Sequence, residues 1–299
     1  MANDINLVKK MLPLLGEIYK SGAKSSGLEA PAEFVQESMQ ANEVKLAKLD
    51  LVGLGDYDKA TGFPTGDITL EWETHTFNND RGRRFSIDRM DDMESFELVA
   101  GRMVGEFMRT QVIPEVDAYR FSKIASATGV ETATAATLTA SSCKSALDAA
   151  IINLQEKEVD DSRMIIYMTP TVAQFLSDNI TRSVANGDKN VNNIIETYNG
   201  IEIVRVPQTR FYKGITLNDG SSASAGGYSK TATTGADINF IVMDRGAVYN
   251  VTKQVVSKYI TPDQNQSKDA HQFDFRLYYE TFILENKAEG IYVHTKAAG

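Results

Sequence analysis

The feature that most constrains the fold is a helical apolar pattern that runs from residue 91 to residue 126. Each of its apolar residues follows an earlier one at a spacing of three, four or a sum of these, namely Phe96, Val99, Met103, Phe107, Val116, Tyr119 and Ile124. Asp91 and Asp92 suit the N-terminus of a helix, and Pro114 predicts a kink or an interruption. At 1.5 Å per residue such a helix would be about 50 Å long, which is longer than a compact domain usually needs. We therefore expect it to span two domains or to brace an extended element.

The stretch GDITLEWETHTFNNDRGRRFSID precedes this helical pattern. Its first half alternates, with Ile68, Leu70 and Trp72 on one side and polar residues on the other, which indicates a half-buried strand. The turn-forming residues 78–82 predict that the chain reverses there and returns through residues 85–87 as a hairpin. A two-stranded hairpin is marginally stable by itself, so we expect it to pack against a partner surface.

Residues 1–50 read as an arm outside the main core. Leu12, Leu15 and Ile18 lie on one stripe of an amphipathic helix, and a second helical pattern follows at residues 34–44. The stripe is broken by charged residues and no small-residue cleavage site follows it, so the segment favours packing on a protein surface over a targeting role.

Helices and strands alternate from about residue 130 to residue 260, which indicates one α+β or α/β unit. The expected elements are a helix at 143–158, a buried strand at 163–169, a short helix at 169–179, and strands at 201–207 and 238–244. Residues 218–236 are poor in apolar side chains and predict an exposed, mobile loop. Residues 273–284 and 291–294 predict two closing strands.

Composition and charge argue against several classes of protein. A formal net charge of -9 is unlike that of a nucleic-acid reader, whose affinity comes from neutralising phosphates. A single cysteine, Cys143, excludes an internal disulfide and a multi-cysteine metal site. No stretch approaches the roughly 18 uninterrupted apolar residues of a membrane-spanning helix.

The sequence carries no recognisable catalytic motif. It contains no nucleophile elbow, phosphate-binding loop, dinucleotide-binding glycine motif or zinc-protease motif. The three histidines lie far apart, which favours solvated or core side chains over a shared metal site. Residues 263–269 imitate the alternating oxygens of a calcium loop, but Lys268 stands where the loop needs glycine and Asp274 where it needs glutamate. We therefore expect no enzyme activity, no cofactor and no bound metal.

The order of these elements resembles the major capsid proteins of tailed bacteriophages, which share the Hong-Kong-97-like fold. Residues 112–125 resemble the second half of the family's spine helix, residues 238–253 its late axial-domain strand and residues 273–294 its final peripheral-domain strands. The resemblance implies an α+β fold with five parts: an N-arm at 1–50, an extended loop at 56–90, the spine helix and first part of the peripheral domain at 91–130, an α/β axial domain at 131–267, and the second part of the peripheral domain at 268–299.

The resemblance implies assembly as the function. Copies of the chain would form pentamers and hexamers and build an icosahedral shell around double-stranded DNA, which they would contact weakly and non-specifically. A scaffolding protein and a portal are the implied partners, a decoration protein is an optional one, and no membrane is involved. The protein would assemble in the host cytoplasm and reside in the virion capsid. An encapsulin shell that houses cargo enzymes is an alternative with the same fold, and a soluble enzyme with an α/β core is a more distant one.

The resemblance also points to candidate contact residues. In the extended loop they are an apolar set and a basic set: Ile68, Leu70 and Trp72, and Arg81, Arg83 and Arg84. Because Trp and Arg most often anchor interfaces, we expect the apolar set to bury against an adjacent subunit and the arginines to pair with its carboxylates. Leu12, Leu15 and Ile18 would make the N-arm contact. Some family members join a loop lysine to a neighbour's asparagine through an isopeptide bond, and Lys59 and Asn286 are the candidates here.

Overall fold

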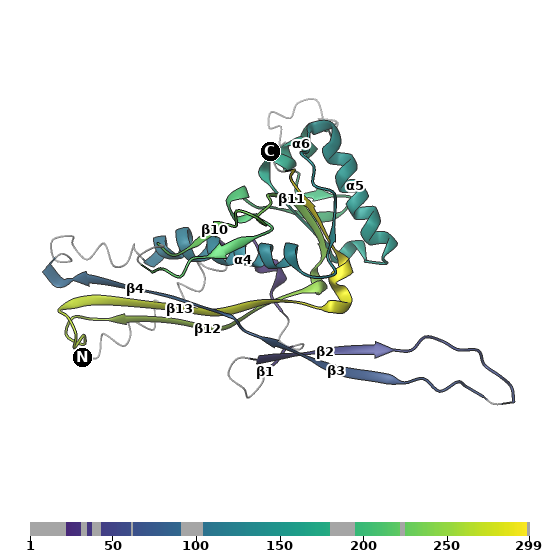
Figure 1. The fold of residues 1–299 in the computed structure, drawn as a ribbon, viewed down its shortest axis with the longest axis horizontal. Coiled ribbons are helices and arrows are strands. Elements are labelled where there is room, and N and C mark those ends of the chain that lie inside the picture. The colour runs from purple at the N-terminus through teal and green to yellow at the C-terminus, as the bar shows by residue number, and fades with distance from the viewer. Residues whose placement is uncertain are drawn as a thin grey trace, which may run out of the picture.

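The computed structural model describes residues 22–30, 35–37, 43–60, 62–90, 104–179, 195–221 and 225–297. Three parts are evident within these ranges (Figure 1): a six-stranded sheet with its helices, a long three-stranded sheet beneath helix α4, and a slender arm that projects away from both. The fold is α+β, as the sequence predicts.

The six-stranded sheet has the order β5-β14-β11-β6-β8-β7. Its strands are β5 (Glu131–Thr132), β14 (Ile291–Thr295), β11 (Ile238–Asp244), β6 (Met164–Met168), β8 (Ile201–Arg205) and β7 (Thr197–Tyr198). Every residue of β6 and β11 is buried, because helices α5 (Ala140–Glu156) and α6 (Pro170–Asn179) cover one face of the sheet and α4 (Ile113–Ser126) covers the other. The predicted helices and buried strands of this unit are confirmed.

The long helical pattern forms one helical run over the described residues 104–126, interrupted by a π-helical turn, η3 (Met108–Val112). Pro114 follows at the start of α4. Proline has no N–H to donate and its ring clashes with the carbonyl four residues earlier, and both proline and a π-helical turn interrupt the regular hydrogen-bond ladder of a helix. The predicted interruption near Pro114 is confirmed. Residues 91–103 lie outside the described residues.

The three-stranded sheet consists of β12 (Val248–Ile260), β13 (Ala270–Ile283) and β4 (Asn79–Asp88). Alternate residues of β13, from Phe273 to Tyr279, pack against Val104, Met108 and other apolar residues of the helical run. The helix therefore covers the six-stranded sheet with one end and braces an extended sheet with the other, which is the role that its length predicts.

The arm is an antiparallel hairpin of β2 (Glu43–Leu51) and β3 (Ile68–Thr76), joined by residues 52–67 at its tip. A short strand, β1 (Val35–Glu37), pairs with β2. We call residues 43–76 the arm and residues 52–67 the arm tip. In Figure 1 the arm points away from the rest of the molecule, and the chain runs on from β3 in the arm to β4 in the three-stranded sheet.

The predicted reversal at residues 78–82 is therefore wrong, because β3 pairs with β2 and β4 pairs with β13. The polar residues that predicted a turn serve another purpose. The Asn78 backbone N–H and the Asn79 side-chain amide donate to the buried carboxylate of Glu280, at 3.1 and 3.0 Å. This anchor holds the chain extended between the two strands.

Three further expectations differ from the structure. Within the helical pattern at 34–44, the described residues 35–37 and 43–44 are strand, in β1 and β2, because β2 pairs with both β1 and β3. The other residues of the pattern lie outside the described residues. Residues 218–236 include β10 (Tyr228–Lys230), which pairs with β9 (Ile215–Leu217), so this region is partly an ordered hairpin. The expected boundary between the axial domain and the second part of the peripheral domain, at residue 267, separates β12 from its partner β13. Strand β14, expected in the peripheral domain with β13, lies in the six-stranded sheet beside β11.

Short helical turns connect these elements. They are η1 (Ser26–Leu28), η4 (Asp161–Arg163), η5 (Gln208–Arg210), η6 (Arg245–Ala247) and η7 (Glu285–Gly290). Of these, η1 is tied to α4, since the Ser25 hydroxyl and backbone N–H both donate to the buried carboxylate of Asp117, at 2.7 and 3.2 Å.

Candidate assembly surface

One face of the arm carries a continuous row of exposed apolar side chains. The register places Leu49 opposite Leu70 and Leu51 opposite Ile68, so both pairs lie on the same face as Trp72. Their exposed fractions run from 48% at Trp72 to 74% at Ile68. We call Leu49, Leu51, Ile68, Leu70 and Trp72 the apolar stripe.

The opposite face of the arm is polar where its side chains are described, with Lys48 opposite Glu71. An apolar row on one face and charge on the other is typical of a sheet that covers a core, yet nothing within the described residues covers the stripe. Burying one large apolar side chain contributes about 1.5–3 kcal/mol. The stripe is therefore a candidate contact surface.

The alternation in the sequence correctly groups Ile68, Leu70 and Trp72 on one face. It misses Leu49 and Leu51, because no strand is predicted before the alternating stretch that begins at residue 66. The alternation of Leu49 and Leu51 around Asp50 is the signal that could have revealed them.

The base of the arm is held by a buried carboxylate. Glu280 is 2% exposed and accepts hydrogen bonds from Asn78 and Asn79 on one oxygen and from the Tyr119 hydroxyl on the other. Burial and the bond to Glu280 raise the pKa of the Tyr119 hydroxyl above its usual range. Phe77 packs beside them against Tyr278 and Phe282. These contacts fix the direction in which the arm leaves the sheet.

Two of the three candidate arginines have carboxylate partners within the chain, where the sequence analysis expected those of a neighbour. Arg81 Nε and Nη2 donate to the two oxygens of Glu115 at 2.7 and 3.2 Å. Arg84 donates in the same bidentate way to Asp274, at 2.7 and 3.0 Å, and the bond lowers the pKa of the Asp274 carboxyl. The difference arises because β4 is paired with β13 in the chain's own sheet, with Arg81 turned toward α4 and Arg84 toward the opposite face.

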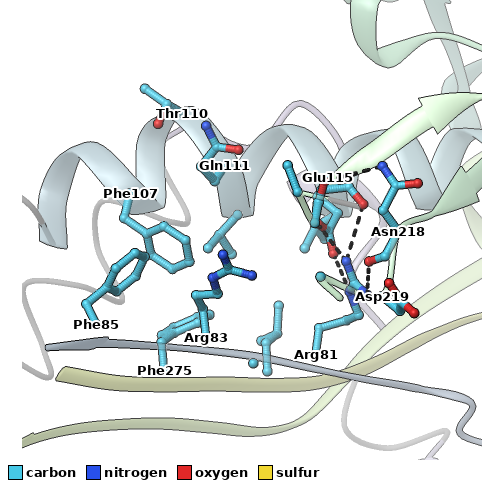
Figure 2. A pocket seen from close by; sticks show the side chains of 18 of the residues that line it. Arg81, Arg83, Phe85, Phe107, Thr110, Gln111, Glu115, Asn218, Asp219 and Phe275 are labelled. Atoms are coloured by element: carbon cyan, nitrogen blue, oxygen red, sulfur yellow. Dashed lines mark hydrogen bonds and ion pairs between the residues drawn. The ribbon is translucent and has the colours of Figure 1, made fainter. Parts of the chain in front are cut away.

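Arg83 differs from both, since it has no hydrogen bond or ion pair with any residue that the structure describes. It projects into a groove of about 620 Å³ between the helical run, strands β4 and β13, and the loop that joins β9 to β10 (Figure 2). Phe85, Phe107 and Phe275 form an apolar wall of this helix–sheet groove, and the Arg81–Glu115 pair lies along it.

The remaining candidate residues are scattered. Leu12, Leu15 and Ile18 lie outside the described residues. Lys59 is exposed at the arm tip, and Asn286 is exposed in η7. The structure does not bring Lys59 and Asn286 together within one chain, as Figure 1 shows from the positions of the arm tip and η7.

The described part of the chain offers no obvious place for a metal ion. No group of three or more His, Cys, Asp or Glu residues in it could hold one. In the run that imitates a calcium loop, the Asn265 side-chain oxygen accepts from the Ser267 backbone N–H at 3.1 Å and from its hydroxyl at 2.8 Å, which makes it part of a turn. Among the described helices, none is both long and apolar enough to cross a membrane.

Solved structures share this combination of a helix-covered sheet, a long braced sheet and a projecting arm. The chain matches the mature capsid of bacteriophage PhiM1 with a TM-score of 0.60 and 14% identity over 88% of this chain and 84% of that one. It matches the capsid of cyanophage P-SCSP1u with a TM-score of 0.58 and 14% identity, over 88% and 86%. It matches a structure from Gordonia phage Cozz with a TM-score of 0.57 and 15% identity, over 94% and 87%.

The chain therefore has the Hong-Kong-97-like fold of tailed-bacteriophage capsid proteins, as the sequence resemblance implies. No protein-family model matches the sequence, and no curated protein is similar enough to count as a relative. The likeness is thus one of fold over most of the chain, at low sequence identity.

Proposed function

We propose that this chain is the major capsid protein of a tailed bacteriophage, a structural protein that assembles into an icosahedral shell of pentamers and hexamers around double-stranded DNA. The apolar stripe carries this proposal. An isolated protein gains nothing from five large apolar side chains held on a thin arm, whereas a shell subunit gains an interface from them. The capsid fold supports the same conclusion.

On this proposal, each part of the fold corresponds to a part of a capsid subunit. The six-stranded sheet with α5 and α6 is the axial domain, around which copies would gather into pentamers and hexamers. The three-stranded sheet with α4 is the peripheral domain, and the arm is the extended loop. These assignments follow the sheets, so they move β12 to the peripheral domain and β14 to the axial domain.

The arm also fits the geometry that closed shells require. A contact between an arm on one copy and a different surface on the next is heterologous, and such contacts close into rings when the rotation between copies allows it. Leu12, Leu15 and Ile18 of the N-arm would add a second contact of the same kind. A scaffolding protein and a portal are the partners that such a shell would need, and a decoration protein would bind its outside.

The acidic charge is consistent with this function. A shell that surrounds DNA need not bind it tightly, and a net charge of -9 keeps contact with the phosphates weak and non-specific. The protein would assemble in the host cytoplasm and end in the virion.

Electron microscopy tests the proposal directly. The full chain, expressed alone and together with a scaffolding protein, should form closed particles, and particles from infected cells should contain nuclease-protected DNA. Particles filled with protein cargo instead would favour an encapsulin. A stable monomer or small oligomer under both conditions would contradict the shell and leave room for a soluble enzyme.

A covalent link between Lys59 and Asn286 of neighbouring copies belongs to the same proposal. Both side chains are exposed, one at the arm tip and one in η7. Mature particles boiled in SDS should then give ladders of linked subunits, which the Lys59→Arg variant should lack. A monomer band from mature wild-type particles would exclude the link.

A further inference from the structure

Arg120, in the middle of α4, is a buried charge without a carboxylate partner. It is 0% exposed, and its hydrogen bond to the described residues runs from Nη1 to the Ser25 hydroxyl, at 2.9 Å. Its Nε and Nη2 have no hydrogen-bond partner among these residues. A guanidinium stays charged in a protein, and a buried charge without a counter-charge is strongly destabilising. Arg120 therefore needs a partner that the described part of the chain does not supply.

Asp117, one turn earlier on α4, cannot be that partner. Its buried carboxylate accepts from the Ser25 N–H and hydroxyl on Oδ1, at 3.2 and 2.7 Å, and from the Lys24 N–H and Arg210 Nη1 on Oδ2, at 3.0 and 3.2 Å. Two carboxylate oxygens offer about four acceptor sites, so all of them are in use. The guanidinium groups of Arg120 and Arg210 stand beside this single carboxylate, which leaves one positive charge uncompensated.

The Tyr167 hydroxyl is a second buried polar group without a partner. Tyr167 is 0% exposed on β6, and its hydroxyl forms no hydrogen bond with the described residues, although a phenol can donate one and accept others. Gly27 of η1 lies beside it. Apart from its chain neighbours, a Cβ atom added at position 27 would meet only the Tyr167 oxygen, at 3.9 Å. The hydroxyl therefore borders unfilled space on the side of η1.

The two groups lie beneath the same turn of the chain. Ser25, which directly precedes η1, accepts the hydrogen bond from Arg120, and Gly27 within η1 borders the Tyr167 hydroxyl. Arg120 is close enough to act electrostatically on that hydroxyl. The site therefore offers two N–H donors from α4 and one O–H donor from β6, all covered by η1.

A small anion suits this site better than a water molecule does. Water would accept hydrogen bonds but would leave the charge of Arg120 uncompensated. An anion accepts the same hydrogen bonds and also supplies the counter-charge. The charges of Arg245 and Glu202, which also reach the Tyr167 hydroxyl, cancel because these two side chains form an ion pair. One uncompensated positive charge calls for a single negative charge, which favours a monovalent ion over a phosphate.

We infer that a small monovalent inorganic anion, with the chemistry of chloride, binds beneath η1 between the Arg120 guanidinium and the Tyr167 hydroxyl. The ion fastens η1 to α4 and β6, so it stabilises the folded subunit in proportion to its concentration. The site lies within one chain, and its test on the unassembled subunit does not depend on whether the protein builds a shell.

Thermal unfolding of the subunit, followed by circular dichroism, tests the inference. Replacing sodium gluconate by sodium chloride at about 0.1 M should raise the wild-type unfolding temperature by about 2–3 °C. Arg120→Met should show no such rise, and in gluconate it should unfold no earlier than the wild type, because it lacks the uncompensated charge. Lys123→Met is the matched control: it removes an exposed charge from the same helix and should keep the full rise. Tyr167→Phe, which loses only the hydroxyl, should reduce it.

No rise in the wild type, or an equal rise in the wild type and in Arg120→Met, would overturn the inference. Should Arg120→Met fail to fold, Tyr167→Phe decides, since a rise as large as that of the wild type would contradict the site.

Diffraction from crystals of the subunit grown in sodium bromide locates the ion. The anomalous signal of bromide should give a peak within hydrogen-bond distance of the Tyr167 hydroxyl and of Nε or Nη2 of Arg120. Density without an anomalous signal would show a water molecule and overturn the inference. A bromide peak without any effect of chloride on unfolding would mean binding at crystal concentration only, which would overturn it as well.

Discussion

The six-stranded sheet and the arm are both built from strands, but they obtain their stability from different sources. All residues of β6 and β11 are buried by helices of the same chain. Among the described residues, the strands of the arm pair only with each other and with the short β1, and the apolar stripe stays exposed. The six-stranded sheet buries its apolar side chains within the subunit, whereas the arm needs another surface to bury the apolar stripe. Substitutions in the two regions should therefore be detected by different measurements.

The largest effect is expected in the six-stranded sheet. Phe240 lies fully buried at the centre of β11 and stacks on His294, with ring centroids 4.9 Å apart. Phe240→Ala should lower the free energy of unfolding of the subunit by about 3–5 kcal/mol through lost burial and a cavity. Denaturant unfolding of unassembled protein measures it. A loss well below this range would mean that the sheet does not form a self-sufficient core.

Trp72→Ala should weaken assembly while leaving the stability of the subunit nearly unchanged. The subunit should unfold at nearly the wild-type denaturant concentration, because the side chain is half exposed. Assembly should weaken by about 2–4 kcal/mol per contact, the range for an aromatic anchor of an interface. Light scattering against protein concentration measures the assembly threshold, and Trp72→Phe is the matched control that retains most of the apolar surface. Normal particles of normal stability from Trp72→Ala would remove the stripe from the interface.

Glu280→Gln tests the junction between the two regions. The variant keeps the size of the side chain but loses the charge that strengthens three hydrogen bonds at the base of the arm. We expect a loss of about 2 kcal/mol in subunit stability, together with weaker assembly because the arm is no longer held in one direction. Loss of subunit stability with unchanged assembly would show that the direction of the arm is not fixed at this point.

The smallest effect concerns acid. Hydrogen bonds from Arg84 and Arg276 lower the pKa values of Asp274 and Asp80. A carboxyl whose pKa is lower in the folded protein than in the unfolded chain stabilises the folded state when the pH is above the unfolded-chain pKa of about 3.9. That contribution is lost as the pH falls through the pKa of the folded protein. Because these pairs lie at the surface, the effect should be slight. The Asp80→Asn, Asp274→Asn double variant should show a flatter fall in unfolding midpoint below about pH 4; an unchanged profile would contradict this role.

Sequence reasoning succeeded where a local pattern decides the structure. Continuous apolar runs predict β6 and β11, helical periodicity and Pro114 predict the interrupted long helix, and alternation predicts which side of β3 is apolar. These patterns also point to the capsid fold, which the solved structures bear out.

The errors have one cause, which is pairing between distant residues. Asn78 and Asn79 resemble turn residues but bind Glu280, some 200 positions away, at 3.1 and 3.0 Å. The start of β2 falls in a helical pattern that its pairing with β3 overrides, and Arg81 and Arg84 pair with carboxylates on α4 and β13. Arg83 cannot be told from Arg81 and Arg84 in the sequence, since only the structure shows that it has no carboxylate partner among the described residues.

Fluorescence of the chain's only tryptophan, Trp72, tests the central claim most directly, because this residue lies on the apolar stripe. We predict that emission from the unassembled subunit is red-shifted and readily quenched by acrylamide, and that assembly shifts it to shorter wavelength and protects it from quenching. Emission and quenching that are the same in subunits and in particles would contradict the account, since the stripe would then remain in water after the shell has formed.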